Sequence, residues 1–154
     1  MARLEAGPPA PAFSLQADDG STVSLADLAG TTVVLYFYPK DDTTGCTAEA
    51  CEFRDLQPDY DAAGARVVGV SPDPLASHAR FRDKLGLGFP LLSDPDHEAA
   101  EAYGVWVEKS RYGKTYMGVE RSTFVVGPGG DIEHVLAQVK PEGHVDQLLE
   151  AIAG

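Results

Sequence analysis

Residues 36–55 read Y-F-Y-P-K-D-D-T-T-G-C-T-A-E-A-C-E-F-R-D and contain both cysteines of the chain, Cys46 and Cys51. Residues 32–38 (T-V-V-L-Y-F-Y), which overlap the start of this stretch, are almost entirely β-branched or aromatic. Because the run is apolar without alternation, it predicts a central strand that is buried on both faces. Pro39 has no N–H to donate within a sheet, so we expect the strand to end there.

A helix is predicted to begin shortly after this strand. Residues 41–45 (D-D-T-T-G) are turn and capping residues, and the residues from Thr47 onward favour a helix. Thr43 or Thr44 is the expected N-cap. Cys46 therefore lies in the first turn, where free N–H groups and the helix dipole favour an anion. If this thiol is partly exposed, we expect the local field to favour its thiolate form.

The spacing of the two cysteines restricts how they can react with each other. Cys51 follows Cys46 by five residues, which in an α-helix separates the two Cα atoms by ~8.7 Å. A disulfide needs Cα atoms closer than ~7 Å. An intact helix therefore cannot join the two sulfurs. A disulfide between them requires the first turns to unwind, so its formation would be coupled to a conformational change.

The rest of the chain alternates predicted strands and helices. The cysteine helix runs to about residue 63, and residues 66–71 (R-V-V-G-V-S) follow as a second buried strand. Two strands joined by a helix favour a parallel pair with a right-handed crossover. The other predicted elements are an N-terminal hairpin (13–16 and 22–24), a helical turn (25–30), helices (74–85, 96–103 and 144–153), a strand (89–93) and a second hairpin (121–126 and 132–139).

This order of elements predicts a single α/β domain over residues 1–154, with a mixed β-sheet flanked by helices. A chain of 154 residues can bury most of the surface that it exposes when unfolded, without disulfide staples. The helix that contains Cys46 begins at the carboxyl end of a central strand, where open α/β sheets place their functional sites.

The charge of the chain excludes some classes of partner. It has 24 acidic and 12 basic residues, for a net charge of -12, so nucleic acid and anionic membranes would be repelled. No run reaches the length of a transmembrane helix, and the N-terminus lacks the apolar core of a signal peptide. We expect a cytoplasmic protein, in which two cysteines are more often reactive than structural.

Each candidate residue also has a purely structural interpretation. Cys46 could be an inert buried thiol, since free cysteines are often buried, and Cys51 could face the core as a small hydrophobe. Thr43 could serve only as an N-cap, and Arg121 could simply offset acidic side chains on the surface. The four histidines, at positions 78, 97, 134 and 144, share no ligand spacing with the cysteines, so we expect no metal site.

The pattern P-x-x-x-T-x-x-C, here Pro39, Thr43 and Cys46, resembles the active-site motif of the peroxiredoxins, thiol peroxidases on a thioredoxin-like fold. With Cys51 at its position in the helix, the chain is most similar to the bacterioferritin comigratory protein or peroxiredoxin Q subfamily. Further similar stretches are Y-G-V-W (103–106), Y-G-K-T-Y-M-G-V-E-R-S-T-F-V-V (112–126) and V-K-P-E-G-H (139–144). One departure is Thr44, where members of the subfamily commonly have proline.

The resemblance implies a role for each site residue. Cys46 would be the peroxidatic thiol and Cys51 the resolving thiol, Thr43 would bind the peroxide, and Arg121 would place its guanidinium beside the thiolate. It also implies a thioredoxin-like fold with an N-terminal β-hairpin extension, a hydroperoxide substrate, a dithiol reductant such as thioredoxin, no cofactor and a monomeric protein.

Acidity of the thiol alone does not account for peroxidase activity. A more acidic thiol is ionised to a larger extent, but its thiolate is a weaker nucleophile, and the two effects largely cancel. The site therefore also needs hydrogen-bond donors positioned at the O–O bond of the peroxide. Two other functions remain open. A thiol–disulfide oxidoreductase usually carries C-x-x-C, and the C-x-x-x-x-C spacing here argues against it. A redox sensor without turnover would form the same disulfide.

Overall fold

The computed structural model describes residues 5–136 and 144–153. Its main strands are β1 (Ser14–Ala17), β2 (Thr22–Ser24), β3 (Thr32–Phe37), β4 (Ala65–Ser71), β5 (Leu91–Ser93), β8 (Ser122–Val126) and β9 (Ile132–Leu136). The helices are the 3-10 turn η1 (Ala26–Leu28), α1 (Thr44–Ala62), α2 (Leu75–Leu85), α3 (Glu98–Ala102) and α4 (His144–Ala153). The strands form one mixed sheet in the order β2-β1-β5-β4-β3-β8-β9.

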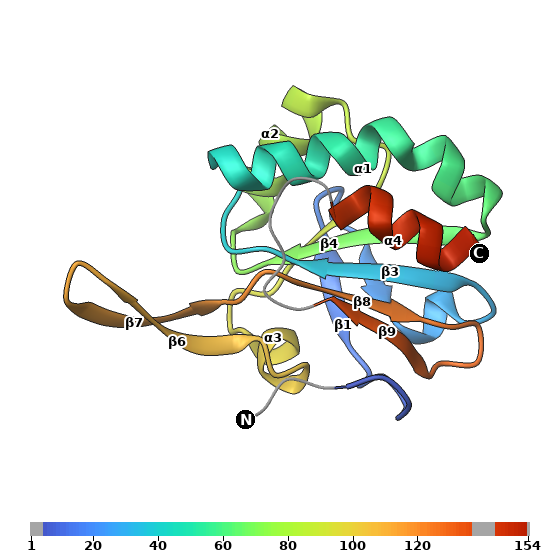
Figure 1. Ribbon diagram of the computed structural model, residues 1–154. Helices are drawn as coiled ribbons and strands as arrows, with labels where there is room; N and C mark the ends of the chain where they lie inside the picture. Colours follow the sequence, from blue (N-terminus) through green and yellow to red (C-terminus); the bar gives the residue numbers. More distant parts are fainter. Residues whose placement is uncertain (1–4, 137–143, 154) are drawn as a thin grey trace.

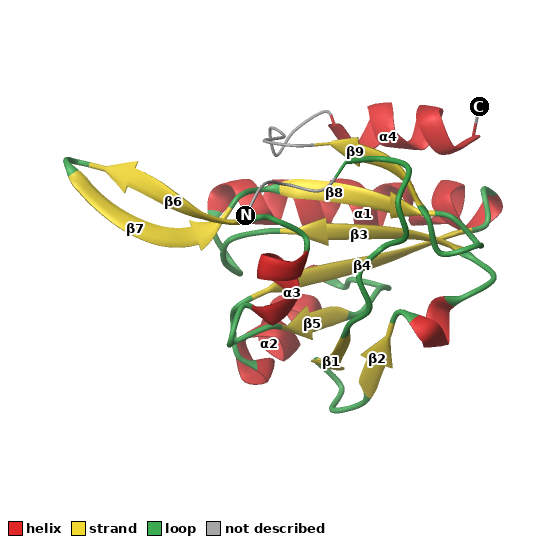
Figure 2. Ribbon diagram, turned by 90° about the horizontal axis from the view of Figure 1, so that it is seen from below, coloured by secondary structure: helices red, strands yellow, loops and turns green. Residues whose placement is uncertain are grey.

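Helices cover both faces of this sheet. One face carries α1, α2 and α4, and the other carries α3 and η1 (Figure 1; Figure 2). The two faces hold separate apolar clusters, one containing Tyr36 and Phe53 and the other containing Phe37 and Phe124. The predicted α/β architecture, with a mixed sheet flanked by helices, is confirmed.

Strand β3 is the central element, as the sequence predicts. It pairs in parallel with β4 and antiparallel with β8. Its side chains alternate between the two clusters, so that Leu35 lies on the α3 face and Val34 on the α1 face. The strand ends at Phe37, although the N–H of Tyr38 still donates to the carbonyl of Val70 at 3.0 Å.

The apolar run of β4 contains one glycine because a β3 side chain needs the space. Gly69 lies beside Tyr36 in the parallel register, and a Cβ atom there would come within 2.9 Å of the Tyr36 ring and 2.9 Å of Leu91 Cδ2. We expect Gly69→Ala to lower the free energy of unfolding by about 1–3 kcal/mol, because buried side chains cannot easily move aside.

Chemical denaturation measures this change. Gly129→Ala is the matched control, since an added Cβ at Gly129 meets nothing within 4 Å, and we expect it to change stability by less than about 1 kcal/mol. A Gly69→Ala variant as stable as the wild type would contradict the close packing of Tyr36 on β4.

The N-terminal hairpin is present and extends the main sheet. Strand β1 pairs antiparallel with β2 and also with β5, where Ala17 lies opposite Leu92. The turn after β1 is tied to α2 because both carboxylate oxygens of Asp18 accept from Arg82 Nη1 at 3.0 Å. The expected hairpin extension is therefore confirmed, as an edge of the sheet rather than a separate flap.

Two strands are missing from the sequence-based prediction. Strands β6 (Trp106–Arg111) and β7 (Lys114–Val119) form a separate antiparallel hairpin that projects from the body (Figure 1). Its two turn residues, Tyr112 and Gly113, have φ angles of 53° and 77°, as in the tight turns that match the twist of a hairpin. Most of its side chains are at least partly exposed, so the strands lack the apolar pattern that identifies core strands.

One part of the prediction lies outside the described residues. Residues 137–143 include the predicted end of the last strand and all but the final residue of the V-K-P-E-G-H stretch.

Candidate active site

The first turn of α1 follows β3 after the short segment 38–43, so the helix begins near the end of this strand, as predicted. Thr43 is the N-cap, with an extended backbone (φ -83°, ψ 158°), and its Oγ1 accepts from the N–H of Cys46 at 3.4 Å. The same hydroxyl donates to the carbonyl of Lys40 at 3.2 Å. Of the two threonines considered as caps, the structure selects Thr43, and Thr44 begins the helix.

The partial exposure that would favour a thiolate at Cys46 is absent in this conformation. The side chain of Cys46 is 1% exposed and belongs to the apolar cluster under α1. Cys51 is half-buried in the same continuous helix, and both thiols are free. The helix is intact between them, so the two sulfurs cannot bond in this conformation.

Arg121 lies directly against the sulfur. Its Nη2 donates to Cys46 Sγ at 3.1 Å, and its Nη1 donates to Glu49 Oε1 at 2.5 Å. Arg121 immediately precedes β8, whose antiparallel pairing places Ser122 opposite Phe37 at the end of β3. Sheet register therefore brings Arg121 to a cysteine that is 75 residues away in the sequence.

The guanidinium is held in its charged form. Burial alone would lower the pKa of Arg121, but the carboxylate of Glu49 and the thiol of Cys46 outweigh this effect and raise the pKa. A fixed positive charge therefore lies in contact with Cys46 Sγ. The pKa of Lys109 on β6 is lowered by burial and then by the charge of Arg121.

Glu49 is the site residue that the sequence analysis misses. It is fully buried, and its carboxylate binds the guanidinium that also contacts Cys46. Its position three residues after Cys46 places both side chains on one face of α1. That spacing was a usable signal, because an acidic residue on the core-facing side of a helix needs a buried cationic partner.

The predicted site residues do not all meet at one point. Thr43 and Arg121 each contact Cys46, Thr43 at the backbone N–H and Arg121 at Sγ. Pro39 lies in the segment between β3 and α1, where it is half-buried, and Cys51 lies further along the helix.

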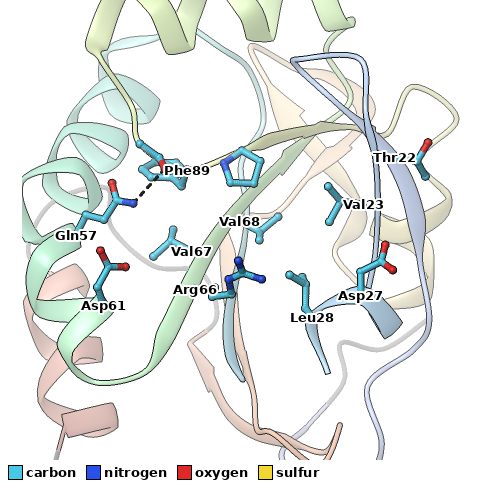
Figure 3. A pocket seen from close by; sticks show the side chains of 12 residues that line it. Thr22, Val23, Asp27, Leu28, Gln57, Asp61, Arg66, Val67, Val68 and Phe89 are labelled. Carbon is cyan, nitrogen blue, oxygen red and sulfur yellow. Dashed lines mark hydrogen bonds between the residues drawn. The ribbon is translucent and has the colours of Figure 1, made fainter. Parts of the chain in front are cut away.

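A cavity of about 420 Å³ lies elsewhere, at the start of β4 and so at the opposite end of the sheet from Cys46 (Figure 3). Arg66 and Val67 line it, as does Gln57, whose Nε2 donates to the carbonyl of Gly88 at 3.1 Å. None of the predicted site residues lines this cavity.

Two classes of feature are absent from the described part of the chain. Residues 5–136 and 144–153 hold no group of three or more His, Cys, Asp or Glu side chains arranged to bind a metal ion. None of the helices in these ranges combines the length and apolar character that crossing a bilayer requires.

The sequence model of the AhpC/TSA family matches residues 6–135. The chain belongs to the AhpC/TSA family. Its relatives include the peroxiredoxin Bcp of Escherichia coli, 46% identical over 149 residues, which cover 97% of this chain and 96% of that protein. The peroxiredoxin Bcp of Bacillus subtilis is 45% identical over 149 residues, covering 97% of this chain and 95% of that protein.

A solved structure of Xanthomonas campestris bacterioferritin comigratory protein is also similar. It superposes with a TM-score of 0.87 and 43% identity, covering 91% of this chain and 89% of that one, and its description concerns alkyl peroxide reduction activity. The protein is therefore a peroxiredoxin, a thiol-dependent peroxidase, and its fold is thioredoxin-like.

Proposed function

We propose that Cys46 is the peroxidatic thiol of this peroxiredoxin and Cys51 its resolving thiol. The observation that carries the proposal is the contact of 3.1 Å between Arg121 Nη2 and Cys46 Sγ at the N-terminal turn of α1. A guanidinium and a helix N-terminus both favour a thiolate, which is the nucleophilic form of cysteine.

In the first step the Cys46 thiolate attacks the terminal oxygen of a hydroperoxide. An S–O bond forms as the O–O bond breaks, so the sulfur is oxidised to a sulfenic acid and the peroxide is reduced. The leaving alkoxide, or hydroxide from hydrogen peroxide, takes up a proton to become an alcohol or water. Arg121 donates hydrogen bonds to the oxygens that gain negative charge in the transition state, as does the hydroxyl of Thr43 once its hydrogen turns away from the carbonyl of Lys40.

In the second step the first turns of α1 unwind and the Cys51 thiolate attacks the sulfenic sulfur. An S–S bond forms, the S–O bond breaks, and the departing hydroxide is protonated to water. Unwinding is required because the helix keeps the two Cα atoms ~8.7 Å apart. It exposes Cys46 and separates Glu49 from Arg121.

A dithiol protein of the thioredoxin type then reduces the disulfide and is itself oxidised. We further propose that the enzyme acts as a monomeric single domain in the cytoplasm. It accepts both hydrogen peroxide and organic hydroperoxides, since the Xanthomonas relative is described by its alkyl peroxide reduction activity.

Stopped-flow consumption of hydrogen peroxide and of a bulky alkyl hydroperoxide by the reduced protein tests this function. Insulin reduction, measured alongside, tests the alternative of a thiol–disulfide oxidoreductase. We expect rapid peroxide consumption and negligible insulin reduction. The reverse pattern would identify an oxidoreductase, and a disulfide without turnover in the presence of a dithiol donor would identify a redox sensor.

Replacing Cys51 should separate the two chemical steps. We expect Cys51→Ser to react with the first equivalent of peroxide at a rate close to that of the wild type, because Cys51 takes no part in O–O cleavage. The product should be a stable sulfenic acid at Cys46, detected by dimedone labelling and mass spectrometry. With a single cysteine left, this variant cannot form an intramolecular disulfide whatever the role of Cys51. The result that would contradict the assigned role is therefore loss of the first turnover.

A further inference from the structure

The segment between β3 and α1 carries a buried carboxylate that the proposed chemistry does not use. Asp41 is 6% exposed and lies two residues before the cap Thr43. Three side chains donate to its oxygens: the Tyr38 hydroxyl at 2.6 Å, His78 Nδ1 at 2.6 Å and the Ser77 hydroxyl at 2.8 Å. Two of these donors belong to α2, so the carboxylate joins the segment to a helix 37 residues away.

Asp41 and His78 form a buried hydrogen-bonded pair. His78 is fully buried, and its Nε2 lies 3.0 Å from the carbonyl of Leu92, which can only accept, so Nε2 carries a hydrogen. Burial raises the pKa of Asp41, but the hydrogen bonds from His78 and Tyr38 outweigh burial and lower it overall. One hydrogen therefore lies in the 2.6 Å contact between His78 Nδ1 and Asp41 Oδ2.

The turn that this pair holds contains a residue in a left-handed conformation. Asp42 has a φ of 61°, a left-handed conformation that costs energy for a residue with a Cβ atom. Outside contacts fix the turn: the N–H of Asp41 donates to Asp73 Oδ2 at 2.6 Å, and Lys84 Nζ donates to Asp42 Oδ1 at 2.7 Å. We call these contacts together the anchor of the turn. Within it, the Asp41–His78 hydrogen bond is buried, so water cannot take the place of either partner.

We propose that Asp41 and His78 are positioning residues for the peroxidatic reaction. The pair fixes the turn against α2. The fixed turn then holds the Thr43 hydroxyl and the N–H groups at the start of α1 in place around Cys46 Sγ. This inference rests on the proposed function of Cys46. Neither residue touches the sulfur, so both act through the backbone between Asp41 and Thr43.

This role predicts different effects on the two steps. Attack on the peroxide requires the turn in place, and misplacement of reacting groups by about 1 Å can cost about 100-fold in rate. Disulfide formation requires the first turns of α1 to leave their place. A loosened anchor should therefore slow the reaction of Cys46 with peroxide about 10- to 100-fold and leave the closure of the disulfide unchanged or faster.

The experiment compares Asp41→Asn, His78→Gln, their double variant and the milder Ser77→Ala with the wild type by stopped flow. We expect slower peroxide attack in each, with the smallest effect in Ser77→Ala. The double variant should be no slower than the slower single variant, because both substitutions break one contact.

Tyr60→Phe is the matched control. It also removes a buried hydrogen bond, from the Tyr60 hydroxyl to the carbonyl of Val145 at 2.7 Å, but in the C-terminal half of α1. We expect it to lower the melting temperature and leave the rate of peroxide attack unchanged. If Tyr60→Phe slows the attack as much as His78→Gln does, the effect is general destabilisation and the proposal is wrong.

Amide hydrogen exchange tests the anchor without any peroxide. We expect exchange at residues 41–47 to be at least about tenfold faster in His78→Gln than in the wild type, since local opening sets the exchange rate, and unchanged there in Tyr60→Phe. Exchange and peroxide attack both equal to those of the wild type would overturn the positioning role. A wild type that consumes no peroxide would instead overturn the proposed function, and the exchange result would still decide whether the pair anchors the turn.

Discussion

Replacing Cys46 by serine is expected to abolish the reaction with hydroperoxides. A serine hydroxyl in the same place is not ionised at neutral pH, and the remaining thiol, Cys51, lies along the helix without the guanidinium contact that Arg121 provides to Cys46. Removal of a covalent nucleophile costs about 10⁴-fold or more in rate. Stopped-flow consumption of hydrogen peroxide by the reduced Cys46→Ser variant measures the loss.

Cys51→Ser serves as the control, because it removes the other thiol from the same helix and should retain the first turnover. A Cys46→Ser variant that consumes peroxide as fast as the wild type would show that Cys46 is not the nucleophile. The unwinding mechanism proposed for α1 would then have no basis.

Replacing Arg121 by methionine is expected to damage both stability and catalysis, for separate reasons. The variant leaves the fully buried carboxylate of Glu49 without its guanidinium partner, and breaking a buried ion pair costs about 3–5 kcal/mol of stability. It also removes a donor placed for charge that develops in the transition state, a loss of about 10²–10³ in rate. Chemical denaturation and stopped-flow kinetics measure the two effects.

The double variant Arg121→Met with Glu49→Gln separates these effects. It contains neither buried charge, so we expect much of the stability to return while the rate of peroxide attack stays low. Arg82→Met is the matched control. It also removes an arginine that is paired with a buried carboxylate, that of Asp18, but Arg82 lies on α2. If the double variant regains the rate of the wild type, Arg121 is structural only.

The local part of the site was predictable because it depends on residues close together in the sequence. The apolar run that forms β3, the proline after it and the threonine cap place Cys46 in the first turn of α1. Helix geometry then separates Cys46 from Cys51 whatever the rest of the fold does. The parallel pairing of β3 with β4 likewise follows from two strands joined by a helix.

The contacts that tune the site were not predictable from such patterns. Arg121 reaches Cys46 only because β8 pairs antiparallel with β3 in one particular register, and the resemblance to a family was needed to single it out. The hydrogen bond between Asp41 and His78 depends on how α2 packs beside the segment before α1. Exposed strands β6 and β7 carry too little apolar pattern to be recognised.

The sequence by itself determined the type of fold, the position of the reactive cysteine at a helix start and the need to unwind that helix before a disulfide can form. These properties follow from short-range periodicity and backbone geometry. Only the tertiary structure decided that Cys46 is buried, that Glu49 holds the guanidinium against it and that Asp41 and His78 form a buried hydrogen bond beside it. Most of those contacts depend on residues far apart in the chain. They are selected by side-chain packing and by sheet register, which no local sequence pattern encodes.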